Sequence, residues 1–422
     1  AGIDFTQYFK NRLYYIDVKG MLSSLHGSAG AITALQNSVA HYYQRASSAD
    51  YLGVDPTRRS LTGTGGYVKV GRKGNAKWNF SETFTWSSPG FDLNDMGYMK
   101  ETDYLMNETE IMYRQTDIWK IFRYNAFTLS QKNMWNYGGT PFSNNASLRW
   151  QSMTMNRYEW DVKETFAWNW LDSRLLRGGP DVRFGSYFLT SAKFNTDKAK
   201  RMMFMLKYEG DHNFEGNRFN TISPSLTFRL GNHVYLSGQL DYAWNTDEMQ
   251  YVATTSPLSS SSLAPYYYVM GHMDQKTYGL TLKLQVNVTP DISIQFYGAP
   301  FTSIAKYDDF KLAADTKSHT FENRFQRIDP DQLTYADGVY TIGEGAGQMP
   351  FRNPDFRFNE FRSNLVARWE YLPGSTLYFV WEHRMSNRDN WYSSGWGSNL
   401  DRMWGLPATN TFMIKMNYWF NL

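Results

Sequence analysis

Residues 280–289 read Leu-Thr-Leu-Lys-Leu-Gln-Val-Asn-Val-Thr, a strict alternation of apolar and polar side chains. Successive side chains of a β-strand point to opposite faces, so this stretch predicts a strand with one apolar and one polar face. The same period of two recurs from end to end of the chain, over spans of about 8 to 12 residues. Further clear examples are residues 202–209, 226–230, 234–242, 365–371, 376–382 and 411–422.

The composition excludes several classes of protein. The 422 residues are 17% aromatic, whereas disordered chains are poor in aromatic residues. No apolar run approaches the roughly 18 residues that a transmembrane helix needs. The net charge of +3 is too balanced to suggest a nucleic-acid binder, and the absence of cysteine excludes disulfides and thiolate metal sites.

Three features favour a transmembrane barrel over a water-soluble antiparallel sheet. The expected strands, of about 10 to 15 residues, exceed the usual length of about 5 to 6. Tyrosine and tryptophan gather near the ends of the apolar faces, as aromatic girdles do at both membrane interfaces. Short connections alternate with long ones, as the periplasmic turns and extracellular loops of outer-membrane barrels do.

We therefore predict an all-β fold, a single transmembrane antiparallel β-barrel spanning residues 1–422, in the outer membrane of a Gram-negative bacterium. Counting back from the last strand gives about 18 strands, or 16 if two are merged around residues 248–275. The long extracellular loops are expected at residues 27–60, 87–103, 173–183, 305–355 and 385–407.

One segment has helical rather than strand periodicity. After Ser28, a plausible N-cap, apolar residues recur mostly at spacings of three and four. The sequence predicts a helical insertion over residues 28–45 on the extracellular side, either capping the mouth of the barrel or entering its lumen.

Two carboxylates break the strand pattern. Glu82 and Glu164 fall on apolar faces, in the similar segments 81–86 and 163–168. The favoured interpretation is a position at the membrane interface or a bulge that turns the side chain inward, since a carboxylate costs little near an interface. The alternative is a seam against which another protein packs.

The polar faces carry charges of both signs. A single-sign lining would have indicated ion selectivity, whereas mixed signs favour a wet interior that pairs its own charges. The residues expected to line the lumen are Lys69, Lys193, Lys207, Arg229, Asp241, Lys283, Arg368, Glu370, Glu382 and Lys415.

The loop at residues 385–407 carries exposed aromatics among short polar residues, which suits stacking on sugar rings or gripping a partner. Packing within the loop itself is the favoured alternative. The candidate ligand-binding residues are Trp391, Tyr392, Trp396 and Trp404. His383, beside Glu382 and Arg384, is a weak candidate for a hydrolase histidine, with no identifiable partner. We expect no catalytic residue, no metal and no cofactor.

Several motifs, in order along the chain, resemble one family. They are His41-Tyr-Tyr-Gln-Arg45, Leu61-Thr-Gly-Thr-Gly-Gly66, residues 88–97, Met273-Asp-Gln-Lys-Thr277 and residues 361–376. Together they resemble the C-terminal barrel region of an outer-membrane family of unknown function. The resemblance implies that full-length members carry a carbohydrate-binding family-9-like domain before a large barrel. It also implies that early barrel strands are missing from these residues, which would raise the strand count.

Three functions remain open at this stage. The first is porin-like transport or ligand capture at the cell surface, with glycans as candidate ligands. The second is a non-transporting subunit or scaffold of a larger outer-membrane complex, and the third and least favoured is an outer-membrane hydrolase. The expected partners are the lipid bilayer, other outer-membrane proteins or surface lipoproteins, and glycans, but not nucleic acid.

Overall fold

One antiparallel sheet of 18 strands dominates the protein, so the all-β fold and the strand count predicted from the sequence are confirmed. The computed structural model describes residues 1–45, 51–74, 76–94, 97–168, 170–231, 233–258, 266–389 and 396–420, and of residues 346 and 396 only the backbone. The strands of this sheet are β1 (Gly2–Phe9), β2 (Tyr14–His26), β3 (Ser60–Arg72), β4 (Trp78–Ser87), β5 (Tyr104–Gln115), β6 (Phe122–Trp135), β7 (Pro141–Thr154), β8 (Glu159–Trp168), β11 (Tyr187–Asn195), β12 (Met202–Asn213), β13 (Arg218–Leu230), β14 (Val234–Thr255), β15 (Tyr267–Asn287), β16 (Ile292–Ala313), β17 (Phe325–Arg327), β21 (Phe356–Leu372), β22 (Ser375–Asp389) and β23 (Thr409–Asn417).

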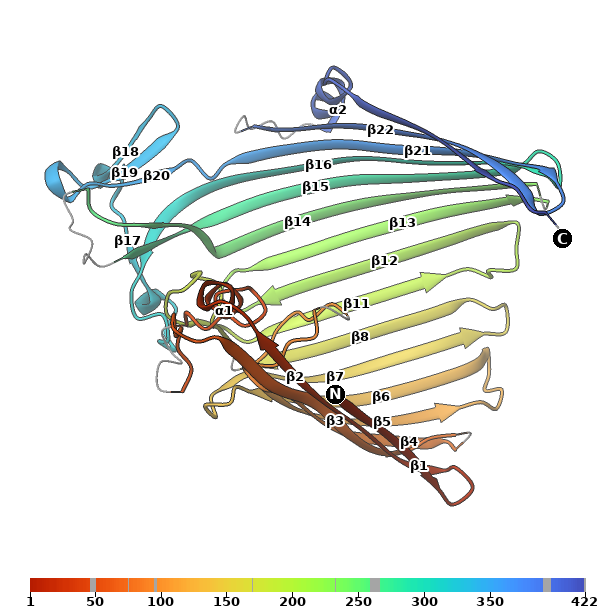
Figure 1. Ribbon diagram of the computed structural model, residues 1–422, viewed down its shortest axis with the longest axis horizontal. Helices are drawn as coiled ribbons and strands as arrows, with labels where there is room; N and C mark the ends of the chain where they lie inside the picture. The colour runs from red at the N-terminus through yellow and green to blue at the C-terminus, as the bar shows by residue number, and fades with distance from the viewer. Residues whose placement is uncertain are drawn as a thin grey trace.

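Seventeen of these strands form a curved wall in which neighbours in sequence are neighbours in space (Figure 1). The exception, β17, pairs only with residues Lys311–Ala313 at the far end of β16. Two small sheets lie in the connections, β9 (Trp170–Asp172) with β10 (Val182–Phe184), and β18 (Leu333–Ala336) with β19 (Val339–Ile342) and β20 (Met349–Arg352). Short 3₁₀-helices cover Glu322–Arg324, Pro330–Gln332 and Gly345–Gly347.

The two ends of the wall differ. Most short connections, such as residues 10–13, 116–121 and 373–374, lie at one end, called here the turn end. The long connections lie at the opposite, loop end, together with the short exceptions at 136–140 and 214–217. The expected alternation of short and long connections is therefore present with few exceptions.

The outward face of the wall is apolar. Strand register places Ile111, Leu129 and Leu148 side by side on three successive strands, and all three side chains are exposed. Aromatic rings flank this band, with Trp78 against Tyr113 near the turn end and Tyr242 stacked on Trp244 toward the loop end. Apolar side chains exposed in a continuous band are costly in water and favourable in lipid, which accounts for the period of two in the sequence.

The predicted helical insertion forms in part. Helix α1 (Ala29–Gln36) begins after Ser28, whose side chain accepts the N–H of Ala31, as expected of an N-cap. The helix ends at Gln36 rather than reaching residue 45. Residues 37–45 turn back, with a positive φ of 52° at Tyr42, and bury His41 and Tyr43 in the loop packing. In the described ranges, no helix is long and apolar enough to cross a membrane.

Two of the expected loops contain more regular structure than predicted. Strand β16 continues to Ala313, so it takes up residues 305–313 of the expected 305–355 loop, and β17 to β20 lie in the remainder. In the 385–407 loop, β22 runs to Asp389 and a second helix, α2 (Trp396–Trp404), follows. The physical reason is burial: Tyr307, Phe310 and Leu312 continue the strand pattern and pack in an apolar cluster beyond the expected membrane band.

Glu82 and Glu164 both remain on the outward face, so a bulge does not turn either of them inward. The pairing of β4 and β8 with their neighbours is regular at these positions. Asn107 and Thr109, on the adjacent strand, donate hydrogen bonds to Glu82, and the Thr190 hydroxyl donates to Glu164 at 2.7 Å. Cross-strand donors therefore satisfy carboxylates that the sequence pattern alone left exposed to lipid.

Candidate functional site

The connection between β8 and β11 folds over the inner face of the wall as a small hairpin, β9–β10. Leu176 and Val182 are fully buried against Met249, Met270 and Phe325, which fixes the hairpin to the long strands β14 and β15. At the start of the hairpin, Asp172 Oδ1 accepts the backbone N–H groups of residues 174 and 175 at 2.7 and 3.0 Å. Such Asx turns reverse the chain tightly. One side of the hairpin packs against β14 and β15, and the other side faces a cavity.

This cavity, called here the hairpin cavity, has a volume of about 870 Å³. Its walls come from the hairpin, from the inner faces of β6, β7, β11 and β12, and from the loops around residues 100 and 215. Cavities of this size are typical of small-molecule sites, which combine apolar surface with a few placed polar groups.

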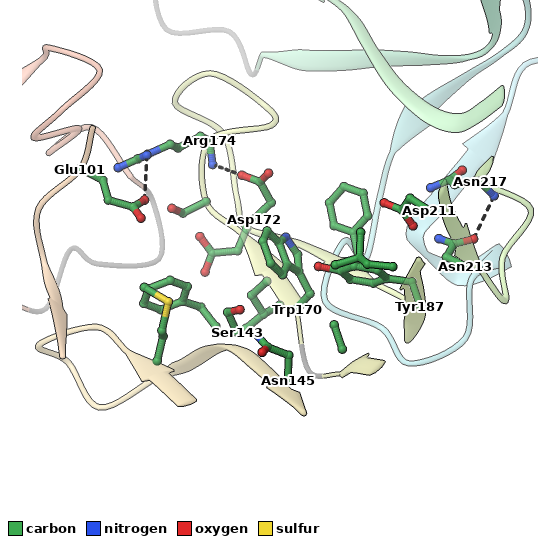
Figure 2. A pocket seen from close by; sticks show the side chains of 18 of the residues that line it. Glu101, Ser143, Asn145, Trp170, Asp172, Arg174, Tyr187, Asp211, Asn213 and Asn217 are labelled. Carbon is green, nitrogen blue, oxygen red and sulfur yellow. Dashed lines mark hydrogen bonds and ion pairs between the residues drawn. The ribbon is translucent and has the colours of Figure 1, made fainter. Parts of the chain in front are cut away.

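Aromatic rings form the centre of the hairpin cavity. Trp170 and Tyr187 meet edge to face with their ring centroids 5.9 Å apart, and Figure 2 shows both rings directed into the cavity. Phe142, Phe184 and Phe219 add further apolar surface. Flat apolar rings of this kind can stack on the C–H face of a sugar.

Polar groups surround these rings. Figure 2 shows Ser143 and Asn145 below Trp170, and Asp211, Asn213 and Asn217 beyond Tyr187. The side chains of Ser143 and Asn145 form no hydrogen bond with the described part of the chain, so both can serve a ligand. The arrangement offers hydroxyl, amide and carboxylate groups around an aromatic centre.

Ion pairs neutralise much of the charge at the cavity wall. Arg45 lies 2.9 Å from Asp103, and Arg174 lies 3.0 Å from Glu101. Asp103 is almost fully buried and also accepts a hydrogen bond of 2.7 Å from the hydroxyl of Tyr51. Burial and this bond raise the pKa of Tyr51, so the phenol stays protonated and donating. The walls thus carry both signs, as the sequence predicted for the interior in general.

The motif Leu61-Thr-Gly-Thr-Gly-Gly66 holds a loop against β3. A Cβ on Gly63 would lie 2.1 Å from the backbone nitrogen of Phe91, and one on Gly65 would lie 2.3 Å from the Phe91 ring. Only glycine permits this approach. The motif therefore has a packing role at the loop end rather than a ligand-binding role.

His41, from the first motif of the family resemblance, is fully buried beside this loop. Its Nδ1 lies 3.1 Å from the Ser38 hydroxyl, and its Nε2 lies 3.7 Å from an Asp92 oxygen. Burial lowers the pKa of His41, which the nearby Asp92 carboxylate only partly opposes.

We expect the packing of residues 28–45 to weaken as the pH falls below about 6.5. In that range an unfolded loop binds a proton that the buried His41 does not, so the loop loses stability until the lowered pKa is reached. Amide hydrogen exchange of this segment, corrected for intrinsic rates, measures the effect. His41→Gln should flatten the pH dependence and His319→Gln, at an exposed position, should not; equal profiles for the wild type and His41→Gln would contradict the assignment.

The candidate aromatics of the 385–407 loop are only partly placed. Trp391 and Tyr392 lie outside the described residues, and of Trp396 only the backbone, at the start of α2, is described. Trp404 ends α2 with about half of its surface exposed, and its ring meets that of Phe361 at 4.8 Å, on the outward side of β21. Trp404, the one member of this set whose side chain is described, does not line the hairpin cavity.

The register places all the residues expected to line the lumen on the inner face, opposite the exposed apolar band. Lys207 pairs with Glu209 on its own strand at 2.7 Å, and Asp241 accepts from the Ser223 hydroxyl at 2.6 Å. These residues lie along the wall and do not line the hairpin cavity. Their role in lining an aqueous lumen stays a prediction.

His383 lies on the outward face, between the rings of Phe361 and Trp381 and 2.8 Å from the Asn410 side chain. These neighbours supply neither a nucleophile nor a carboxylate, so the geometry gives the hydrolase hypothesis no support. Among the described residues, no group of three His, Asp or Glu side chains could hold a metal ion.

One signal for the hairpin cavity is present in the sequence, but it is ambiguous. The segment Trp168-Asn-Trp170 opens a long connection, but an aromatic at a strand end is equally expected of a membrane girdle. Only the fold separates the two roles, because it places Trp168 on the outward face and Trp170 in the cavity.

Comparison with known proteins gives a family match and one distant structural similarity. The model of a domain of unknown function (DUF5916) matches residues 27–422. The crystal structure of the siderophore receptor PirA from Acinetobacter baumannii is similar at a TM-score of 0.40 and 9% identity, over 98% of this chain and 70% of that one. No curated protein is detectably similar in sequence.

Proposed function

Because the chain belongs to the family of the domain of unknown function DUF5916, whose name supplies no activity, we propose a function from geometry alone. The protein is an outer-membrane β-barrel that captures a small, uncharged glycan in the hairpin cavity at the loop end. The observation that carries the proposal is the pair of rings, Trp170 and Tyr187, set among hydroxyl, amide and carboxylate groups.

The outward face of the wall supports a location in a membrane. Its exposed apolar band and flanking aromatic rings match the outward face of an outer-membrane barrel. Long connections gather at one end, which in such barrels is the extracellular end. That orientation would present the hairpin cavity to ligands arriving from outside the cell.

The preference for an uncharged ligand follows from the charges at the cavity. Arg45 and Arg174 are engaged by Asp103 and Glu101. The further charged groups are of both signs: Lys100, Lys132 and Arg218 are positive, and Asp172, Asp181, Asp211 and Asp247 are negative. An anionic or cationic ligand would therefore meet as much repulsion as attraction, whereas hydroxyl groups can use both kinds of partner.

Binding of neutral hexasaccharides of glucose and of N-acetylglucosamine, measured by calorimetry on the detergent-solubilised protein, tests this function. Trp170→Ala should weaken binding about tenfold, because truncating a central aromatic typically costs more than 1 kcal/mol. Tyr335→Ala, an exposed tyrosine on β18, is the matched control and should change nothing. Unchanged affinity in Trp170→Ala would reject the cavity, and a loss only in Trp404→Ala would move the site to the 385–407 loop.

A second candidate, a subunit of a larger outer-membrane complex, is favoured by one observation. Polar side chains form a contiguous group on the outward face of β4 to β6, between apolar rings at both ends of these strands. This outward polar patch consists of Glu82, Asn107, Thr109, Gln131 and Asn133. Asn107 and Thr109 already satisfy Glu82, but the side chains of Gln131 and Asn133 form no hydrogen bond with the described residues. Lipid offers these two amides none, whereas the polar surface of another membrane protein would.

The two functions differ in their measurable behaviour. Capture or transport requires that the purified protein alone binds the hexasaccharides, and open-pore transport also requires single-channel current in a planar bilayer. A subunit role instead predicts one stable partner on gentle solubilisation of native membranes, lost when Gln131 and Asn133 are replaced by leucine.

A further inference from the structure

The wall of the barrel has two edges that lack a second partner in the described residues. Strand β1 pairs only with β2, and β23 pairs only with β22. Every residue of β1 and of β23 is exposed, unlike those of the strands between them. Figure 1 shows the wall curving from the red N-terminal strands around to the blue C-terminal ones, with these edges facing an open side.

The direction of the two edge strands decides how this side can close. Strand β1 runs toward the turn end, since it leads into the short turn at residues 10–13. Strand β23 also runs toward the turn end, where the N–H of Trp419 bonds to the Ser375 hydroxyl beside the β21–β22 turn. The wall therefore has an odd number of strands, 17, and its two edges are parallel to each other.

In a bilayer an open edge is unstable, because the unpaired backbone N–H and C=O groups find no hydrogen-bond partner in hydrocarbon. Direct pairing of β1 with β23 would put a parallel ladder in a wall that is otherwise antiparallel. A second copy in the same membrane orientation offers only the same two parallel edges. An antiparallel wall with an even number of strands, the rule for bacterial single-chain barrels, requires a different partner.

We propose that β1 and β23 are joined by an odd number of amphipathic β-strands from polypeptide outside residues 1–422, the strand beside each edge running from the turn end to the loop end. This inference rests on the membrane location proposed above, but not on the glycan-binding function. It assigns the two edges as an interaction surface for β-strand addition.

The side chains of the two edges define the chemistry of the added strands. On the outward side the edges carry Ile3 and Phe5, and Phe412, Ile414 and Met416. On the inward side they carry Asp4, Thr6, Thr411 and Lys415. A strand that extends this surface must alternate apolar and polar residues, with acceptors placed to face Lys415.

Photo-crosslinking tests the proposal on the complete natural polypeptide in its native outer membrane. Benzoylphenylalanine replaces Phe5 on one edge or Phe412 on the other, and the same replacement of Phe204, an outward residue within the wall on β12, is the control. Tyr8 and Met413 provide an inward-facing pair if an outward variant fails to insert.

The expected result is a peptide adduct at both edges, with an alternating sequence that lies outside residues 1–422. Phe204 should give only lipid or peptides of the adjacent strands β11 and β13. An adduct between β1 and β23, any edge adduct with residues 1–422, or adducts with lipid alone would overturn the proposal. Failure of the protein to fractionate with the membrane would instead reject the membrane location.

Discussion

Replacing Arg324 with methionine is expected to destabilise the loop end by about 3–5 kcal/mol, the usual cost of breaking a buried ion pair. The Arg324 guanidinium is 1% exposed and binds both carboxylate oxygens of Glu215, at 2.7 and 2.9 Å. It also donates to the carbonyl groups of Arg183, Ser318 and His319. Three separate connections therefore depend on one side chain, and its loss leaves Glu215, whose side chain is only 12% exposed, without its counter-ion.

Amide hydrogen exchange of residues 183–186, 213–217 and 315–325 measures this effect, and all three segments should lose protection together. Arg327→Met is the matched control, because Arg327 is 72% exposed and meets Asp309 at 3.3 Å, a contact worth about 1 kcal/mol or less. The double variant Arg324→Met, Glu215→Leu should recover much of the loss, since it removes both charges. Equal effects of Arg324→Met and Arg327→Met would refute the role assigned to the pair.

Replacing Leu282 with arginine should cost about 2–4 kcal/mol if the outward face meets lipid, the range for arginine near the bilayer midplane. Leu282 is exposed on β15 and lies opposite Gly238 and Gly298 on the adjacent strands, so the substitution meets no steric obstacle there. The loss of folding free energy in Leu282→Arg therefore depends on whether lipid or water surrounds the side chain, and not on steric crowding.

Gln285→Arg is the control on the same strand. Gln285 is exposed on the inner face, where an added charge stays hydrated, so we expect little change in folding. Urea titration of the protein in lipid vesicles compares the two variants. Equally small effects would mean that the outward face is not in lipid, and would favour the water-soluble sheet that the sequence left as the alternative.

The sequence predicted the strands of the wall because each strand follows a local rule, the alternation of apolar and polar residues. The alternation in residues 280–289 requires only that one face of the strand meets lipid and the other a polar environment. The register of β15 with β14 and β16 places its apolar residues on the outward face, as this requires. The start of α1 was equally local, since the Ser28 cap acts within one turn. The end of α1 was not, because the fold of residues 37–45 depends on burial of Tyr43 and His41 against distant segments.

The candidate site could not be predicted from such local patterns. Trp170 and Tyr187 are seventeen residues apart and belong to different elements, and no spacing in the sequence marks them as a pair. Their meeting depends on the β9–β10 hairpin, which Met249, Met270 and Phe325 hold in place from three other strands. The aromatics of the 385–407 loop stand out in the sequence by local composition instead, and Trp404 lies on the opposite side of the wall.

The sequence by itself determined the strands and the two faces of the wall, because lipid and water act on each side chain separately and leave a period of two. Only the tertiary structure decided which connections fold inward, which carboxylates find donors, and that the two edge strands run in the same direction. Those outcomes depend on contacts between residues far apart in the chain, for which a single sequence carries no periodic signal.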